Sequence, residues 1–319
     1  LDEHLFSLPD QPTLIPYRTS YYQPNWGFCL SHEARQQLTG DQYEVCIDST
    51  LDAGGFLTYG ELVLPAATPD EMLLSCHCCH PSLANDNLSG LVVAVFLAQA
   101  LARQPRRRYT YRFVFGPGTI GAIVWLSHNR DTVHRIRHGL VLTLLGGPGE
   151  FTYKQSRRGT APIDRAAALV LRDAGLPHTV RPWLPYGYDE RQYCSPGFNL
   201  PVGCLSRTPF GEFPEYHTSA DDLTLVQPDQ LAGSLELVQA LCSALEQNRC
   251  YRNLSPYGEP QLGRRGLYKG IGGGQEGADW QLALLWLLSL SDGQHSLLDV
   301  AEQSSLPLER LRRAAQALE

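Results

Sequence analysis

The stretch CHCCHPSLANDNLSG, residues 76–90, connects one apolar run to the start of another and decides how the chain is interpreted. It contains three cysteines, two histidines and an aspartate, which are residue types that bind metals or carry redox chemistry. Three interpretations are open: a structural zinc knot, a redox centre, or half of a hydrolytic metal site.

The first two interpretations fit the spacing poorly. A structural zinc site needs two separated pairs of Cys or His ligands, and the later Cys242 and Cys250 lie on or just after a predicted helix. The CxxC motif at 76–79 is a redox motif when it opens a helix, whereas here Pro81 and a loop follow. The hydrolytic site fits best, because a strand ends, a histidine follows, and residues 85–90 lead into a helix.

Candidate ligands for such a site occur in two distant parts of the sequence. Asp86 stands at a helix entrance, where a short carboxylate can bridge two zinc ions, and the small Ser89 and Gly90 allow the helix to pack closely. Far downstream, His217 offers a second imidazole, with Asp221 close enough in sequence to orient it.

Around this stretch, predicted strands alternate with predicted helices. The strands are expected at 72–76, 111–115 and 139–145, and the helices at 88–101, 120–129, 161–174 and 228–248. Such alternation predicts an α/β domain over residues 69–262, with a mostly parallel sheet flanked by helices and functional groups at the carboxyl ends of its strands. Before it, β-branched and aromatic runs separated by turn residues predict a small β-rich domain within residues 1–68.

The C-terminal part has a different pattern. After a glycine-rich stretch, helices are expected at 280–290, 297–303 and 308–318, a spacing typical of a helix-turn-helix or winged-helix module over 275–319. The chain stops where a wing would begin, so we expect this module to be truncated. One interpretation is DNA contact through Arg310, Arg312 and Arg313. The other, which we favour because the whole chain is acidic, is a solvated helix face on a protein-docking module.

Composition narrows the class of protein. The 319 residues carry a formal net charge of -7, which argues against a nucleic-acid partner. We find no apolar run of the roughly 18 residues needed to span a membrane. Nine cysteines in a chain of this size favour reduced thiols and a cytoplasmic location. Because the only methionine is Met72, we expect the encoded start to be missing. As to assembly, the sequence is compatible with a homo-oligomer.

Taken together, the motifs resemble those of aminopeptidase-like proteins in the co-catalytic zinc aminopeptidase superfamily. The most similar branch is bacterial and often encoded with polysaccharide biosynthesis genes. The resemblance covers essentially the whole chain and includes TSYYQPNWGFCLSH, CHPSLANDNLSG, RFVFGPGTIGAI, FTYKQSRRG, YDERQYCSPGFNLPVG and PEYHTSADDL. It implies a zinc-aminopeptidase-like α/β fold with a small inserted β domain and a C-terminal winged helix. It also implies that the first peptidase segment is missing, and that one or two Zn²⁺ ions serve hydrolysis of a peptide or small amide.

The resemblance also implies roles for individual residues. His80 resembles the first zinc ligand, and His77 is an alternative because it lies nearby at the same strand end. Asp86 resembles the bridging carboxylate and His217 the distal ligand, with Asp221 expected to orient His217.

Two glycines depart from the family pattern. The family resembles Pro-Glu-Thr-Ile-Gly where this chain has Gly118, and Gly-Asp-Pro-Gly where it has Gly147. The missing glutamate would be the general base, whose loss costs about 10²–10⁴-fold in rate. The missing aspartate would be a zinc ligand. The alternative function is therefore a catalytically inactive aminopeptidase-fold protein that serves in ligand binding or protein docking, and enzymatic activity stays open.

Other residues are candidates to act near the same site. Asp189 and Glu190 could replace the base or a ligand, or could form a surface pair with Arg191. We expect Arg191, Arg158 and Tyr216 to contact substrate.

Overall fold

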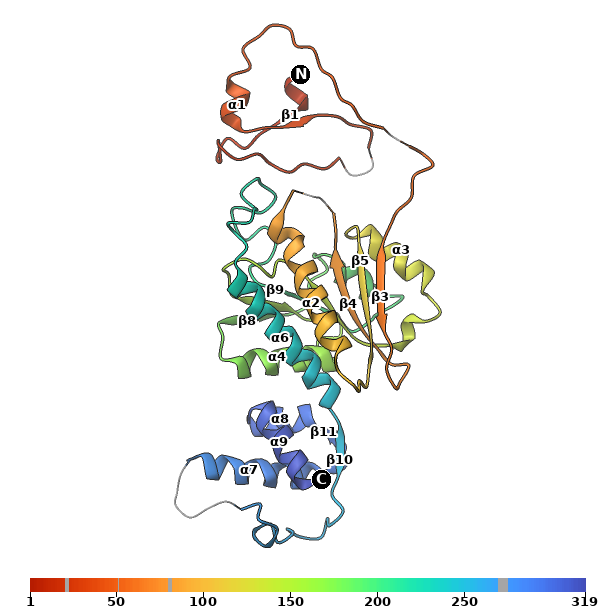
Figure 1. The fold of residues 1–319 in the computed structure, drawn as a ribbon, viewed down its shortest axis with the longest axis vertical. Coiled ribbons are helices and arrows are strands. Elements are labelled where there is room, and N and C mark those ends of the chain that lie inside the picture. The colour runs from red at the N-terminus through yellow and green to blue at the C-terminus, as the bar shows by residue number, and fades with distance from the viewer. Residues whose placement is uncertain (21–22, 51, 80–81, 269–274) are drawn as a thin grey trace.

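The computed structural model describes residues 1–20, 23–50, 52–79, 82–268 and 275–319. An N-terminal segment, a central α/β domain and a C-terminal helical module follow one another along the long axis of the molecule (Figure 1). All nine cysteines are free thiols.

The central domain is built on a seven-stranded sheet with the strand order β3-β5-β4-β6-β9-β7-β8. The strands are β3 (Gly60–Leu64), β4 (Glu71–His77), β5 (Thr110–Gly116), β6 (Ile136–Leu142), β7 (Phe151–Lys154), β8 (His178–Arg181) and β9 (Val202–Ser206). Strands β5, β4, β6 and β9 run parallel, while β3 and β7 are antiparallel to β5 and β9. The mostly parallel sheet that the alternation predicts is confirmed.

Helices cover both faces of this sheet. The first face carries α2 (Gly90–Ala102), α4 (Pro162–Ala174) and α6 (Pro228–Gln247), and the second carries α3 (Ile120–His128) and α5 (Glu190–Tyr193). Strand β4 is buried along its whole length, and its alternate residues supply both cores: Met72 and Leu74 the first, Leu73 the second. This double burial explains why β4 reads as a continuous apolar run.

The helix entered from the metal motif is more apolar than expected. Together with the irregular helical segment η2 (Ala84–Ser89), α2 gives a span, Ala84–Ala102, that is long and apolar enough to cross a membrane, contrary to our expectation. However, 61% of the most apolar 18-residue stretch of this span is buried inside the fold. A helix at the centre of a protein core has the same length and apolar composition.

The end of β6 also differs from the prediction. The apolar run predicts a strand to residue 145, but β6 ends at Leu142 and a buried loop follows. In this loop the N–H groups of Leu144, Leu145 and Gly146 donate to side-chain oxygens of η2 rather than to a neighbouring strand. The loop can therefore stay buried without belonging to the sheet.

The N-terminal segment contains fewer strands than its β-rich pattern predicts. Its regular elements before β3 are the short helices η1 (Asp2–His4) and α1 (His32–Gln36) and the strands β1 (Leu5–Phe6) and β2 (Phe28–Cys29). Most described side chains between residues 37 and 59 are exposed. Little apolar surface is thus buried there to hold a sheet together.

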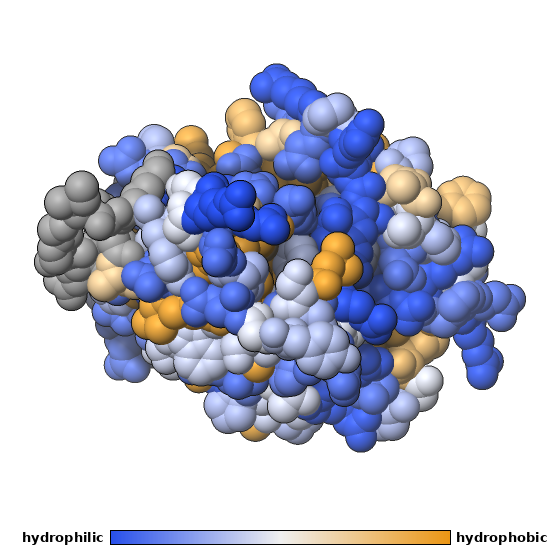
Figure 2. All heavy atoms as spheres, turned by 90° about the horizontal axis from the view of Figure 1, so that it is seen from below, coloured by the Kyte–Doolittle hydropathy of each residue, from blue (hydrophilic) through white to orange (hydrophobic). Residues whose placement is uncertain are grey.

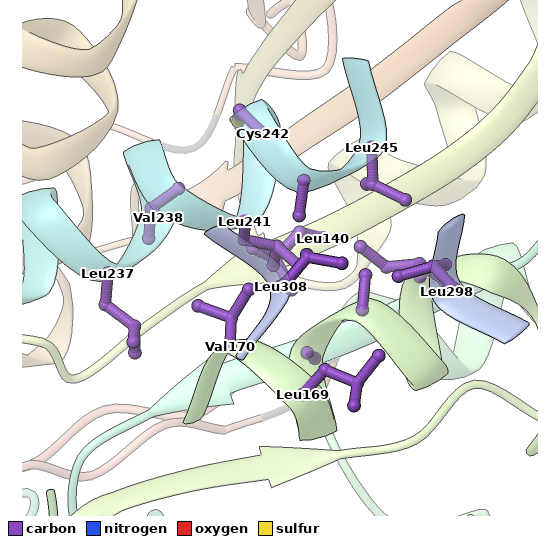
Figure 3. Close-up of a cluster of buried hydrophobic side chains, with 14 of the residues drawn as sticks. Leu140, Leu169, Val170, Leu237, Val238, Leu241, Cys242, Leu245, Leu298 and Leu308 are labelled. Atoms are coloured by element: carbon purple, nitrogen blue, oxygen red, sulfur yellow. The ribbon is translucent and has the colours of Figure 1, made fainter. Parts of the chain in front are cut away.

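The C-terminal module contains the three predicted helices, α7 (Gln275–Leu290), α8 (Leu297–Ser304) and α9 (Leu308–Leu318). Two strands add to them: β10 (Cys250–Arg252) pairs antiparallel with β11 (Asp292–Ser296). Short 3₁₀ turns, η3 (Val133–Arg135) and η4 (Gly263–Arg265), complete the fold. Leu298 and Leu308 of the module pack into the same apolar core as α4 and α6 (Figure 3).

Candidate metal and active site

Asp86 lies between two imidazoles. Its Oδ1 is 2.7 Å from Nε2 of His77, and its Oδ2 is 3.1 Å from Nε2 of His217. Asp86 and His77 are buried, whereas the side chain of His217 is 31% exposed. Burial opposes ionisation of Asp86, but the hydrogen bonds from His217 and His77 outweigh it and hold the pKa of the carboxyl well below its ordinary value. The carboxylate is therefore ionised and shared between the two rings.

The backbone around Asp86 is fixed by Asp221. The Asp221 carboxylate accepts hydrogen bonds from the N–H of Asn85 at 2.5 Å and from that of Asp86 at 3.0 Å. Its backbone carbonyl accepts a third, from Ala84. We expected Asp221 to orient His217; the contacts that it makes are instead with the backbone of residues 84–86, beside the Asp86 carboxylate.

The polar residues flanking Asp86 connect it to the loop after β6. Asn85, Asn87 and Ser89 accept the N–H groups of Gly146, Leu144 and Leu145, at 2.9, 3.1 and 2.9 Å. Their types held a signal that we did not use, because polar side chains entering a buried helix need partners inside the protein.

Gly90 permits the close approach of α2 to β6. A Cβ at this position would lie 2.5 Å from Oδ1 of Asn87 and 2.5 Å from the carbonyl oxygen of Leu142. The expected role of a small residue at the start of this helix is confirmed.

His217 is held by aromatic neighbours and by the N-terminal segment. Tyr216 stacks on its ring with centroids 3.9 Å apart, and Tyr17 meets it edge-on at 5.0 Å. The N–H of Tyr17 donates to the carbonyl of His217, and Ile15 and Ser219 exchange backbone and side-chain hydrogen bonds. Tyr216, expected at the substrate, thus lies beside a candidate ligand. Nothing in the sequence indicated that Tyr17 would contact His217.

Tyr188 fills the space beside Gly118, where the family pattern has its glutamate. A Cβ on Gly118 would lie 2.1 Å from Cε1 of Tyr188. The same ring packs on His77 at 3.9 Å, and its hydroxyl lies 3.4 Å from Sγ of Cys79. At Gly147, by contrast, a Cβ would meet, among the described residues, only the amide end of Asn85, at 3.3 Å. A side chain at position 118 would therefore collide with Tyr188, whereas one at position 147 has room beside the described residues.

The two candidate replacement carboxylates are both buried. Glu190 forms an ion pair with Lys154, and its two oxygens accept the N–H of Tyr188 at 3.1 Å. Asp189 is 2% exposed, its Oδ1 has no hydrogen-bond partner among the described residues, and burial raises its pKa to about 8. Glu190 is thus engaged in holding its own loop, and Asp189 is mostly protonated at neutral pH.

The two arginines have different surroundings. Arg191 is exposed, while Arg158 donates from Nε and Nη2 to the carbonyl of Asn199, at 3.0 and 2.7 Å. In this structure Arg158 therefore holds a loop of its own chain.

An apolar cavity of about 340 Å³ is lined by residues of β7, β8 and β9 and of the loops that follow β8 and β9. Trp183, Tyr186 and Phe210 line it, with Lys154 and Glu190 among its polar groups. Phe210 connects it to the site, because its ring lies 6.3 Å from that of Tyr188.

The donor types fit zinc. His80 lies outside the described residues. Of the two candidate histidines, His77 is described, and its Nε2 lies 2.7 Å from Asp86. Among the residues described, no three His, Cys, Asp or Glu side chains gather around one point as ligands of a single ion. Instead each Asp86 oxygen faces its own imidazole, an arrangement compatible with a carboxylate shared between two metal positions.

Comparisons with known proteins place the chain in a family. Residues 13–248 match the family described as a domain of unknown function (DUF4910), and residues 249–319 match a winged helix-turn-helix. A Clostridium acetobutylicum protein described as a polysaccharide biosynthesis protein with an aminopeptidase-like domain is 45% identical, over 100% of this chain and 73% of its own length.

Solved structures agree with this assignment. A crystal structure described as that of a peptidase from Clostridium acetobutylicum is 44% identical, with a TM-score of 0.92 over 100% of this chain and 72% of its own. Glutaminyl cyclase from Porphyromonas gingivalis shares the fold alone, at 15% identity and a TM-score of 0.51 over 59% of this chain and 78% of its own. The chain therefore belongs to the DUF4910 family of aminopeptidase-like proteins and carries a C-terminal winged helix.

Proposed function

We propose that this chain is a zinc-dependent, aminopeptidase-like hydrolase that acts on a peptide or small amide. The observation that carries the proposal is the buried Asp86, with one oxygen facing His77 and the other facing His217. Imidazole and carboxylate are ligands that Zn²⁺ prefers in catalytic sites. When bound, Zn²⁺ supplies Lewis-acid polarisation of a substrate carbonyl and lowers the pKa of water.

The surrounding residues support this assignment because each candidate ligand is held in place. Asp221 fixes the backbone of Asp86, Tyr188 packs on His77, and Tyr216 stacks on His217. Supporting contacts of this kind orient metal ligands before the metal binds. The cavity lined by Trp183, Tyr186 and Phe210 suits an apolar side chain of a substrate.

We expect turnover to be slow. Gly118 cannot accept a proton, Tyr188 occupies the space of the missing side chain, and Glu190 is paired with Lys154. Loss of a general base lowers rates by about 10²–10⁴-fold. These same contacts favour the second candidate function, an inactive aminopeptidase-fold protein that binds a ligand or partner through the retained site.

Hydrolysis assays on the zinc-loaded full chain separate the two functions. With a panel of aminoacyl 4-nitroanilides, we expect slow release that falls at least about tenfold in His217→Ala, because this variant removes a ligand. The control His134→Ala replaces an exposed histidine elsewhere and should leave the rate unchanged. Zinc binding without any turnover would favour the inactive protein. Turnover equal in wild type and His217→Ala would contradict the proposed site.

A further inference from the structure

The second helix of the helix-turn-helix, α9, has its N-terminal end against the α/β domain. The N–H of Leu308 donates to Oδ2 of Asp173 in α4 at 2.7 Å. Leu308 and Arg312 line a groove of about 560 Å³ together with residues of α4 and α6, such as Val170 and Leu237. In DNA-binding helix-turn-helix proteins this end of the second helix contacts base edges. In this protein the same end of α9 contacts the carboxylate of Asp173 and lies beside α4 and α6.

The charges of the module do not suit a phosphate backbone. Residues 275–319 contain three basic and seven acidic residues. Of the three arginines, Arg310 donates to Asp279 at 2.5 Å and Arg312 donates to Glu309 at 2.6 Å. Duplex DNA binding depends on basic side chains that neutralise phosphates. The module has few such side chains, and two of them are already paired within it.

The acidic side chains of α8 pair instead with the α/β domain. Arg165 of α4 donates to Oδ1 of Asp299 at 2.7 Å and to both carboxylate oxygens of Glu302, at 2.8 and 2.6 Å. On the next turns of α4, Arg172 donates to the carbonyl of Leu306 in the turn before α9. Two parallel hydrogen bonds from one guanidinium to one carboxylate, as from Arg165 to Glu302, fix the orientation of the two groups as well as their distance.

Apolar packing continues across the same boundary. Leu297, Leu298 and Leu308 are buried and belong to one core with Val170 of α4 and Leu241 of α6 (Figure 3). The outer end of the module carries mostly hydrophilic side chains, with apolar ones in separate groups (Figure 2). The apolar surface of the helix-turn-helix is therefore directed toward the α/β domain.

From these contacts we infer that the winged helix is an intramolecular docking module: its recognition helix is bound by α4 and α6 of the same chain and does not read duplex DNA. The inference is independent of the proposed hydrolysis. It gives the C-terminal module a protein partner, the face of α4 on which Arg165 binds Asp299 and Glu302 and Arg172 binds the carbonyl of Leu306. It also predicts that the two parts unfold together.

Hydrogen exchange of the full chain, measured by mass spectrometry, tests this inference. In the wild type, α8 and α9 should exchange as slowly as α4, because one cooperative unit opens as a whole. Arg165→Glu places a third acid beside Asp299 and Glu302, and should accelerate exchange in α8 and α9 by roughly tenfold or more. The control Arg106→Glu makes the same charge change at an exposed residue in the loop before β5. It should leave exchange in α8 and α9 unchanged.

Two further measurements keep the test decisive. Arg165→Gln removes the ion pairs without adding an acid, so it serves if Arg165→Glu does not fold. Fluorescence anisotropy with a labelled 20-base-pair duplex at low salt should show no binding by the full chain. Exchange in α8 and α9 that is unaffected by Arg165 would overturn the inference. So would salt-sensitive duplex binding that is lost in Arg312→Gln/Arg313→Gln.

Discussion

At the residue scale, Gly118 and Tyr188 form a complementary pair in which one ring fills the volume that a glutamate would need. Gly118→Glu alone should destabilise the protein by about 1–3 kcal/mol, because its Cβ would lie 2.1 Å from the ring of Tyr188. It should bring no gain in activity. Urea denaturation and kcat/KM measure both effects.

Removing the ring should reverse this result. In Gly118→Glu/Tyr188→Ala/Gly147→Asp the base and the ligand both have room, and hydrolysis should rise by about 10²-fold or more. Gly197→Glu is the matched control, because a Cβ at Gly197 has no neighbour within 4 Å. If Gly118→Glu is as stable as Gly197→Glu, Tyr188 does not block the site.

The buried carboxyl group of Asp189 should make the stability of the protein depend on pH. Burial raises its pKa to about 8, above the ordinary value of 3.8. The folded protein therefore holds a proton that the unfolded chain releases between these values. The contribution of this group to stability is complete below about pH 4 and is lost as the pH rises to about 8, with a slope of up to about 1.4 kcal/mol per pH unit.

Asp189→Asn should remove this slope, so that the variant gains stability relative to wild type from pH 5 to pH 8. Urea unfolding at several pH values measures it, with Asp131→Asn as the control at an exposed aspartate. Parallel pH profiles for wild type and Asp189→Asn would show that Asp189 is already ionised in the folded state and available as a base.

At the element scale, the start of α2 sets the position of the candidate site around Asp86. Gly90→Ala should destabilise the protein by about 1–3 kcal/mol, although Ala favours helix, because the added Cβ would lie 2.5 Å from the Leu142 carbonyl. In α6, Gly233→Ala is the control: its Cβ meets only the end of Arg207, at 3.4 Å, so we expect a gain of up to about 1 kcal/mol. Urea midpoints compare the two variants; equal effects would contradict the close packing at Gly90.

The elements also show what could be predicted from sequence. Helices α4, α6 and α9 were predictable because apolar residues recur along each of them and a proline lies at or just before the start of each. Helix α9 was predicted with its observed bounds. Strands β7, β8 and β9 were not identified, since each has only four or five residues and is defined by its neighbours in the sheet. The polar strand β11 had no local signal at all.

The site was only partly predictable for similar reasons. Asp86 and His217 were identified from their residue types and surroundings, yet only the fold brings these two residues, 131 positions apart, into contact. The choice between His77 and His80 stayed open because both follow the same strand. Tyr188 could not be found, because the space that it fills exists only in three dimensions.

At the scale of the whole molecule, the α/β domain holds the other two parts of the chain at different places. The N-terminal segment supports His217 through Tyr17, the sheet presents His77, and the C-terminal module packs against α4 and α6. This arrangement explains why the candidate site is assembled from distant segments.

Zinc titration into the metal-free full chain by calorimetry tests the central claim most directly, with His77→Ala and His80→Ala compared against wild type. We predict that His77→Ala weakens zinc binding by about 100-fold or more, since a direct ligand matters at least as much as its supporting contacts. His80→Ala tests the other candidate for the first ligand, which lies outside the described residues. Wild-type protein that is folded but binds no zinc, or zinc binding by His77→Ala as tight as that of the wild type, would contradict the account.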